Sequence, residues 1–359
     1  MKKIILMVLA ALLLLSCTKE DTTSKNSILV NNNGKPSNPS FEYKITELFK
    51  LDYIEKGIMS INDIESTING ELYLLDSRSL KIFHTDEKLK ILNSFGRQGA
   101  GPGEFENAFD LNMINDSLIV IDDRLKRISL FGMDGKFIRS EAMTDNVAWV
   151  KSHNGTYFGL TTSDETKDEK QYSVQNLNIL TKKFQALSSF YEKKKFIRNP
   201  QMNVVRLTKT AVKDDEIYLY EASKKNINIV VYNLKGEIVR TIKDKAPVIK
   251  ISDEEIKELT EKYSKFGFGA EVTQELIFVN GKKKDTVKEL YIDKNGILWV
   301  SKTSKNELNK EVTVYSLYVN GVYTKDVTIP LNIEHKLFFK NDKIYAVYDG
   351  TVTVYEYGI

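Results

Sequence analysis

Six stretches of the chain repeat one pattern, and the clearest are NGELYLLD at residues 69–76 and NDSLIVID at residues 115–122. Each starts with a polar turn and continues as a strand of alternating apolar residues. A second polar turn and another apolar strand follow, LKIF at 80–83 and RISLF at 127–131. Alternation with a period of two predicts β-strands. Four further copies begin at residues 154, 214, 294 and 341, of which the one at 154 is the weakest.

The spacing of the copies predicts how the strands are grouped. Corresponding positions are residues 76, 122, 161, 221, 301 and 348. Four strands with their turns need about 40–50 residues, which is the period of a propeller blade. Six copies therefore predict an all-β fold, a six-bladed β-propeller of four-stranded antiparallel blades. A seven-bladed or irregular propeller is the alternative, because the later copies match only in strand pattern.

The longest interval between copies, from 221 to 301, contains a helical pattern. Ser252 is suited to cap a helix, and Glu255 follows three residues later. Ile256 and Leu259 would then share one face of that helix. We expect one short helix ending near residue 265, inserted between the fourth and fifth blades.

The sixth copy supplies only three strands before the sequence ends. The stretch FEYKITELF at residues 41–49 alternates in the same way and lies at the opposite end of the chain. We expect it to complete the last blade and close the ring, which would protect strand edges that could otherwise pair with other chains. A single domain over residues 41–359 is predicted.

The connection at residues 95–105, FGRQGAGPGEF, and the strand pair after it resemble an NHL-type propeller repeat. The wider resemblance is to six-bladed β-propeller lipoproteins common in Bacteroidetes, most of which have no assigned function. The glycine-rich signature occurs once. The resemblance implies a closed propeller and leaves the ligand open.

The first sixteen residues have the features of a signal peptide. Lys2 and Lys3 precede an uncharged run over residues 4–15, which is shorter than the roughly 20 residues that span a bilayer. The run ends in Leu14-Leu15-Ser16-Cys17, which resembles the bacterial lipobox. We therefore expect residues 1–16 to be removed and Cys17, the only cysteine of the chain, to carry lipid. An ordinary secretory signal is the alternative.

Composition narrows the range of partners. The chain has 52 Lys and Arg against 49 Asp and Glu, and loss of Lys2 and Lys3 leaves it nearly neutral. A nucleic-acid binder would show a basic excess, so no nucleic-acid partner is expected. Residues 17–40 are polar and should form a flexible tether after the lipidated cysteine. The lipid would hold a monomeric propeller on the outer membrane, facing the periplasm or the cell surface.

The turns that follow the second strand of each blade, and the connections between blades, should emerge on one face of the ring. Loops on a rigid scaffold are common binding sites, and the channel mouth is a natural pocket. On that face we place the following candidate binding residues: Asp76, Arg78, Arg97, Gln98, Glu104, Asp122, Arg124 and Glu221. A structural role is the alternative, because an Asp at a strand end often caps the next turn.

Catalytic patterns are scarce. The histidines His84, His153 and His335 show no zinc-ligand spacing, and no Gly-x-Ser-x-Gly turn is present. We therefore expect neither catalytic residues nor a zinc site. Asn62, Asp63 and Asp110 lie near the starts of innermost strands and could supply oxygen ligands to calcium.

The sequence favours a lipid-anchored propeller of the cell envelope that acts as a binding or scaffolding module for a protein, peptide or glycan. The alternative is a metal-dependent hydrolase or lyase with its site in the propeller channel. A purely structural envelope protein is a third class.

Overall fold

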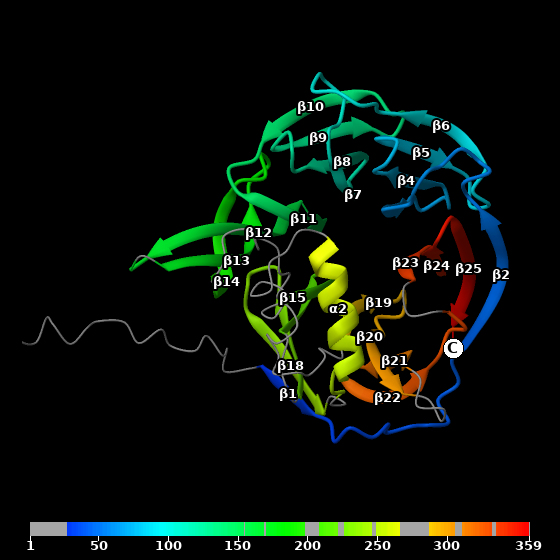
Figure 1. Ribbon diagram of the computed structural model, residues 1–359, viewed down its shortest axis with the longest axis vertical. Helices are drawn as coiled ribbons and strands as arrows, with labels where there is room; N and C mark the ends of the chain where they lie inside the picture. Colours follow the sequence, from blue (N-terminus) through cyan, green and yellow to red (C-terminus); the bar gives the residue numbers. More distant parts are fainter. Residues whose placement is uncertain are drawn as a thin grey trace, which may run out of the picture.

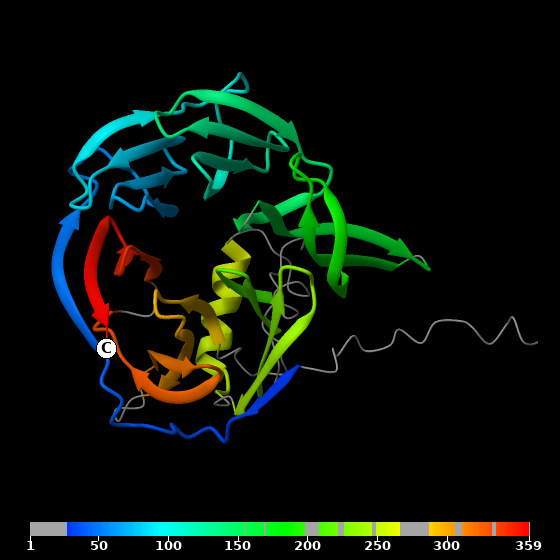
Figure 2. The same cartoon turned by 180° about the vertical axis from the view of Figure 1, so that it is seen from behind.

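Six antiparallel sheets arranged in a ring make up the fold (Figures 1 and 2). The computed structural model describes residues 27–153, 155–168, 170–197, 208–221, 226–245, 249–265, 287–305, 311–331 and 335–358. In each sheet the strands run in order from the ring centre to the periphery, and in two sheets a strand from the N-terminal segment lies outermost. The prediction of a six-bladed propeller is confirmed.

The first three blades follow one another along the chain. Blade 1 contains β3 (Asp63–Ser66), β4 (Leu72–Asp76), β5 (Lys81–Thr85) and β6 (Ile91–Phe95). Blade 2 contains β7 (Ala108–Ile114), β8 (Ser117–Asp122), β9 (Arg127–Gly132) and β10 (Phe137–Ala142). Blade 3 contains β11 (Asn146–His153), β12 (Thr156–Lys167), β13 (Lys170–Leu180) and β14 (Ala186–Ile197). The β12–β13 hairpin extends well outside the ring (Figures 1 and 2).

Blades 4 to 6 include the strands contributed by the N-terminal segment. Blade 4 contains β15 (Thr208–Lys213), β16 (Glu216–Glu221), β17 (Asn226–Asn233), β18 (Ile238–Lys245) and the added β1 (Ile28–Asn31). Blade 5 contains β19 (Val287–Ile292), β20 (Leu298–Lys305), β21 (Glu311–Val319) and β22 (Val322–Val327). Blade 6 contains β23 (Lys336–Lys340), β24 (Lys343–Tyr348), β25 (Thr351–Gly358) and β2 (Lys44–Asp52).

The hydrophobic core is divided among the interfaces between blades. Successive side chains of a strand point to opposite faces of its sheet. Leu72 and Leu74 of β4 therefore pack against blade 6, whereas Tyr73 and Leu75 pack against blade 2. Five further strands repeat this arrangement, and six apolar clusters join the described blades into a closed ring. The alternating repeats seen in the sequence are thus the inner layers of this core.

An N-terminal strand closes the ring, as expected, but it lies further along the chain than the sequence suggested. We expected residues 41–49, and the strand that pairs antiparallel with β25 is β2 (Lys44–Asp52). The difference arises because Tyr43 lies in the core before the strand begins, where its hydroxyl donates to the Asp293 carboxylate at 2.5 Å. The alternation of apolar and polar residues that predicted the strand runs through residue 41 as well as residue 44, so it does not mark where the strand begins.

Part of the segment that we expected to be a flexible tether is ordered against the ring. β1 (Ile28–Asn31) pairs in parallel with β18 and gives blade 4 a fifth strand. The chain then follows the outer edge of blade 5, where the amides of Ser37 and Asn38 donate to the carbonyls of Tyr323 and Thr324 at 2.9 and 3.1 Å (Figure 1). The expectation of a tether over residues 17–40 is therefore wrong for this part, because backbone pairing at a sheet edge requires no apolar side chains.

The predicted helix is present as α2 (Asp253–Lys265), in the connection between blades 4 and 5. Ser252 caps it as expected, since its Oγ accepts a hydrogen bond from the Glu255 amide at 3.2 Å. Among the described residues no helix is both long and apolar enough to cross a membrane.

Candidate functional site

The innermost strands of all six blades surround a central cavity of about 340 Å³. The strands are β3, β7, β11, β15, β19 and β23, which lie around the centre of the ring (Figures 1 and 2). Its charged lining consists of Asp63, Glu65, Asp110, Lys151, Lys209, Glu289, Lys336 and Lys340. Its apolar lining is provided mainly by Trp149, Leu160, Ala211, Leu290, Ile292, Phe338 and Phe339. A cavity of this size falls at the lower end of the range for small-molecule sites.

Glu65 connects three blades across this cavity. Its carboxylate is buried and pairs with the Lys151 ammonium of blade 3 at 3.0 Å and with the Lys340 ammonium of blade 6 at 2.6 Å. Burial alone would raise the pKa of Glu65, but the two lysines outweigh that effect and lower it. Both carboxylate oxygens of Glu65 are therefore engaged by lysine ammonium groups.

Asp63 and Asp110 lie side by side on β3 and β7. Both oxygens of Asp63 accept backbone hydrogen bonds, from the amides of Ile64 at 2.9 Å and Leu111 at 3.1 Å. Asp110 accepts a hydrogen bond from the side-chain amide of Asn112. Burial and the neighbouring Asp63 carboxylate raise the pKa of Asp110 to about 8. Burial also raises the pKa of Asp63. At neutral pH this part of the cavity therefore retains a proton.

Two N–H donor groups of the lining have no partner among the residues that the structure describes. The Lys209 ammonium of β15 makes no hydrogen bond or ion pair with any of them. The indole Nε1 of Trp149 is a buried donor and is also unpartnered. Lys336, in contrast, donates to the Asn62 carbonyl and lies over the Phe338 ring. The lining thus leaves donors available, whereas most of its acceptors are occupied.

The two aspartates proposed from the sequence as binding residues play equivalent structural roles. Asp76 accepts hydrogen bonds from the amides of Met59, Arg78 and Ser79, at 2.7 to 3.1 Å. Asp122 accepts from the equivalent amides of blade 2, those of Glu106, Asn107, Arg124 and Leu125, at 2.8 to 3.1 Å. Both side chains are buried. Each fixes the turn after the second strand to the segment before the first, as the structural alternative predicts.

The other proposed binding residues lie on the connection between blades 1 and 2 or close to it. Arg97 forms an ion pair with Glu104 at 2.7 Å, and Glu104 also accepts a hydrogen bond from the Gly101 amide at 2.8 Å. Gln98 forms an isolated bridge with Phe105. These contacts join residues within the connection, and Arg97 remains largely exposed.

Gly96 explains why this connection is rich in glycine. Its φ is +85°, and a Cβ there would lie 2.6 Å from the Phe105 ring. Arg127 then fastens the connection by donating to the carbonyls of Ala100, Gly101 and Glu104, at 2.7 to 2.9 Å. The glycine-rich signature therefore builds a tight backbone path between blades.

The remaining candidates are less informative. Arg124 is exposed and pairs with Glu106 at 3.2 Å, and Arg78 donates its backbone amide to Asp76. The backbone of Glu221 ends β16, but its side chain lies outside the described part of the chain, as does the whole of Cys17.

Of the three residues considered for calcium, the structure brings two to the cavity. Asp63 and Asp110 line it, whereas the Asn62 side chain accepts hydrogen bonds from the Ser60 and Ser77 hydroxyls at 2.7 and 2.6 Å. No group of three or more His, Cys, Asp or Glu in the described residues is arranged to hold a metal ion. In the cavity, lysines occupy the positions next to Glu65 that a cation would need.

His84 and His335 lie away from the cavity lining. His84 stacks on Tyr73 and contacts the Glu71 carboxylate at 3.0 Å, and His335 lies beside the Tyr348 ring. The side chain of His153 is outside the described residues.

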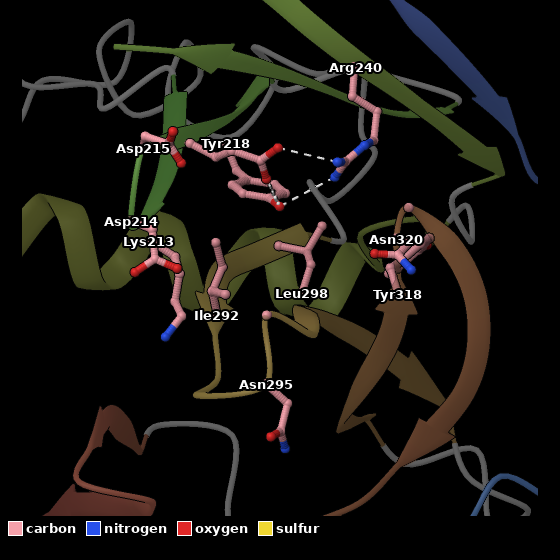
Figure 3. A pocket seen from close by; sticks show the side chains of 13 residues that line it. Lys213, Asp214, Asp215, Tyr218, Arg240, Ile292, Asn295, Leu298, Tyr318 and Asn320 are labelled. Atoms are coloured by element: carbon pink, nitrogen blue, oxygen red, sulfur yellow. Dashed lines mark hydrogen bonds and ion pairs between the residues drawn. The ribbon is translucent and has the colours of Figure 1, made fainter.

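A second cavity, of about 180 Å³, lies between blades 4 and 5 (Figure 3). The turns at residues 213–216, 292–298 and 320–321 form its rim. Its most prominent charged group, Arg240, is bound to Glu216 at 3.2 Å and to the Tyr218 hydroxyl at 3.4 Å. Because this guanidinium is already paired, we regard the central cavity as the better candidate site.

The lysines of the central cavity were missed by sequence reasoning. Lys151, Lys209, Lys336 and Lys340 each occupy an innermost strand. The available signal was a lysine within a strand that opens a repeat, where the inner edge of the sheet would otherwise be apolar. Sequence alone does not distinguish such a lysine from one on the outer surface.

The fold and cavity together define a six-bladed β-propeller with a charged central channel. Residues 42–213 match the family DUF5128, which is described as a 6-bladed beta-propeller. None of the proteins of curated function matches the chain.

Two solved structures from Bacteroides share the fold. One is a protein of Bacteroides fragilis with a provisional description as exported; it is 12% identical with a TM-score of 0.55 and covers 92% of this chain and 99% of its own. The other is a DUF4221 family member from Bacteroides vulgatus, 11% identical with a TM-score of 0.50, covering 88% of this chain and 98% of its own. At these identities the likeness concerns the fold alone.

Proposed function

We propose that this protein is a lipid-anchored propeller of the cell envelope that binds a ligand in its central cavity. The observation that carries the proposal is the concentration of charged side chains on the innermost strands, where four lysines and four acids line one cavity. The ligand would be a glycan, a peptide or an exposed segment of a protein.

Charge at this position argues for binding because it does not help the fold. Replacing a buried ion pair by well-packed apolar residues is often neutral or stabilising. The interfaces between blades already supply six apolar clusters, so the ring has no need of ion pairs at its centre. A polar lining that is not needed for stability is reasonable where the cavity receives a polar ligand.

The lipid anchor is the second part of the proposal and rests on the Ser16-Cys17 motif behind a short apolar run. The provisional description of the Bacteroides fragilis neighbour as exported supports a location outside the cytoplasm. Only ten residues lie between Cys17 and Ile28, where β1 starts. They can span at most roughly 35 Å, so a lipid on Cys17 would keep blade 4 close to the membrane.

A metal-dependent hydrolase or lyase is the alternative function. It would need carboxylates available to a cation, and in the cavity Glu65 is paired with two lysines while Asp63 accepts two amides. These contacts favour binding over metal chemistry as the role of the cavity.

Closing the cavity provides the test. Thr210 lines the cavity from β15, and Thr210→Trp would fill part of it. The matched control is Leu187→Trp, on the exposed surface of blade 3. Both purified variants, with Thr210→Phe as a smaller substitute if the first does not fold, would be used to recover envelope glycans and peptides. We expect the Leu187 variant to retain what wild type binds and the Thr210 variants to lose it.

Equal recovery by all variants would place the binding site elsewhere. For the anchor, wild-type protein expressed in bacteria should incorporate labelled fatty acid and Cys17→Ala should not. Absence of label in the wild type would refute the lipid part of the proposal.

A further inference from the structure

We infer that the ligand of the central cavity carries an anionic group, a carboxylate or a phosphate, which the Lys209 ammonium binds. This inference rests on the proposed function and specifies it further. Lys209 and the indole of Trp149 are the cavity donors left without partners among the described residues. Ammonium and indole N–H groups have no acceptor capacity, so the ligand must supply the acceptors.

Most carboxylate oxygens of the lining are already in use. Glu65 binds two lysines, and the two oxygens of Asp63 bind two backbone amides. Glu289 accepts from the Leu290 amide at 3.3 Å. Asn112, whose side-chain oxygen is buried and unpartnered, is not part of the cavity lining. A cationic ligand would therefore compete with existing bonds, whereas an anion meets free donors.

The balance of charge favours the same ligand. Burial keeps Asp110 protonated at neutral pH, since its pKa is raised to about 8. The four lysines of the lining then outnumber the ionised carboxylates. Charge-assisted bonds between an ammonium and an anion are shorter and stronger than neutral ones, and in a confined cavity they are less screened by salt.

Asp110 makes this preference depend on pH. The charged groups that face it are Asp63 and Glu65 of β3 and Lys151 of β11, with the uncharged Asn112 on its own strand. Lys336 and Lys340 of β23 act on the same cluster through Asp63. When pH rises above the pKa of Asp110, one more negative charge appears in the cavity, and affinity for an anion should fall.

Matched pairs of small probes test the inference by calorimetry. Glucuronate is compared with glucose, and an acetylated dipeptide with its C-terminal amide; each pair differs only at the carboxylate, and together they distinguish a sugar from a peptide source. Inorganic phosphate is the third anion. We expect at least one anionic probe to bind and its neutral counterpart to bind much more weakly.

Two substitutions locate the effect. Lys209→Met should weaken anion binding roughly tenfold, the value of one charge-assisted hydrogen bond. Lys50→Met, on the exposed face of β2, is the control and should bind as wild type does. Wild type should lose affinity between pH 7 and pH 9, and Asp110→Asn should bind equally at both, as expected if ionisation of Asp110 is the cause.

Failure of the inference can be separated from failure of the proposed function. If an envelope ligand is lost in Thr210→Trp but kept in Lys209→Met, the cavity is a binding site for something other than an anion. If neutral probes bind as well as anionic ones, or if no anion binds at millimolar concentration, the inference is overturned. If Thr210→Trp leaves binding unchanged, the cavity itself is the wrong site.

Discussion

The ring contains aspartates at two positions in the blades, at the ends of second strands and on first strands. Comparing them shows how the position in a blade determines the role of the same side chain. Asp76 and Asp122 end the second strands of blades 1 and 2, where each carboxylate is surrounded by backbone amides. Asp63 and Asp110 lie on the first strands of the same blades, inside the cavity. The same residue type in adjacent strands of one sheet therefore caps a turn in one case and lines the cavity in the other.

The pKa values of Asp76 and Asp110 reflect this difference. Burial by itself would raise the pKa of Asp76, but hydrogen bonds from its turn and from the Met59 amide outweigh burial and lower it. At Asp110 burial and the Asp63 carboxylate outweigh the Lys151 ammonium and the Asn112 side-chain amide, and the pKa is raised. The balance between burial and the donors and cations around a carboxylate therefore decides the direction of its pKa shift.

Removing the Glu65 charge, which bridges two lysines of the cavity, should have the largest effect. Glu65→Gln leaves Lys151 and Lys340 without their shared counter-ion. Both lysine side chains are partly exposed, so water can solvate them once the counter-ion is gone. We therefore expect a loss of about 2–4 kcal/mol in the free energy of unfolding, slightly less than for a fully buried pair. Denaturant unfolding measures it.

The control is Glu87→Gln, which breaks an exposed ion pair with Lys343 at 2.8 Å. It should leave stability close to wild type, since exposed pairs contribute little. Equal effects of the two substitutions would show that the cavity network is no more important than a surface pair.

The contributions of Asp110 and Asp76 to the free energy of unfolding should change with pH in opposite directions. The folded pKa of Asp110, about 8, lies above its unfolded value near 4, so wild type should lose stability relative to Asp110→Asn as pH rises between those values. The slope is at most about 1.4 kcal/mol per pH unit. Asp76 has a lowered pKa, so wild type should gain stability relative to Asp76→Asn as pH rises through about 4, with no change above.

The measurement is denaturant unfolding of wild type, Asp110→Asn and Asp76→Asn at several pH values from acid to pH 9. The same sign for both variants would contradict the assignment of a retained proton to Asp110.

The smallest effect is expected for arginines on the face that the sequence singled out. Arg97 and Arg124 are largely exposed, and each pairs with one carboxylate. Arg97→Ala and Arg124→Ala should melt within error of wild type, because such pairs are weak in water. Binding of the envelope ligand should also be retained. Loss of binding in either variant, with folding intact, would move the site from the cavity to this face.

More of the fold than of the site could be predicted from the sequence, for a physical reason. The repeats at residues 69–76 and 115–122 mark strands that are buried on both faces, which is a local property of each strand. Ring closure also followed, because an alternating segment near one end matched a missing strand near the other. The ordered course of β1 could not be predicted, since its pairing with β18 uses backbone groups and leaves Ile28 and Leu29 exposed.

The site was only partly predictable because it is assembled from strands far apart in sequence. Asp63 and Asp110 were recognised as oxygen ligands near the starts of innermost strands, which is where the structure places them. That Lys151 and Lys340 approach Glu65 depends on the angles between blades 1, 3 and 6, and no local pattern encodes those angles. A carboxylate that looks free in the sequence is therefore neutralised by distant residues.

The pairing of β2 with β25 has a consequence for how the chain is made. Residue 44 pairs with residue 358, so β2 leaves the ribosome with no partner and waits until almost all of the remaining chain has been synthesised. Contacts this distant in sequence slow folding. During that interval β2 is an unpaired edge that other chains could capture. Its exposed residues Lys44, Glu47 and Lys50 place charge along this edge throughout the delay.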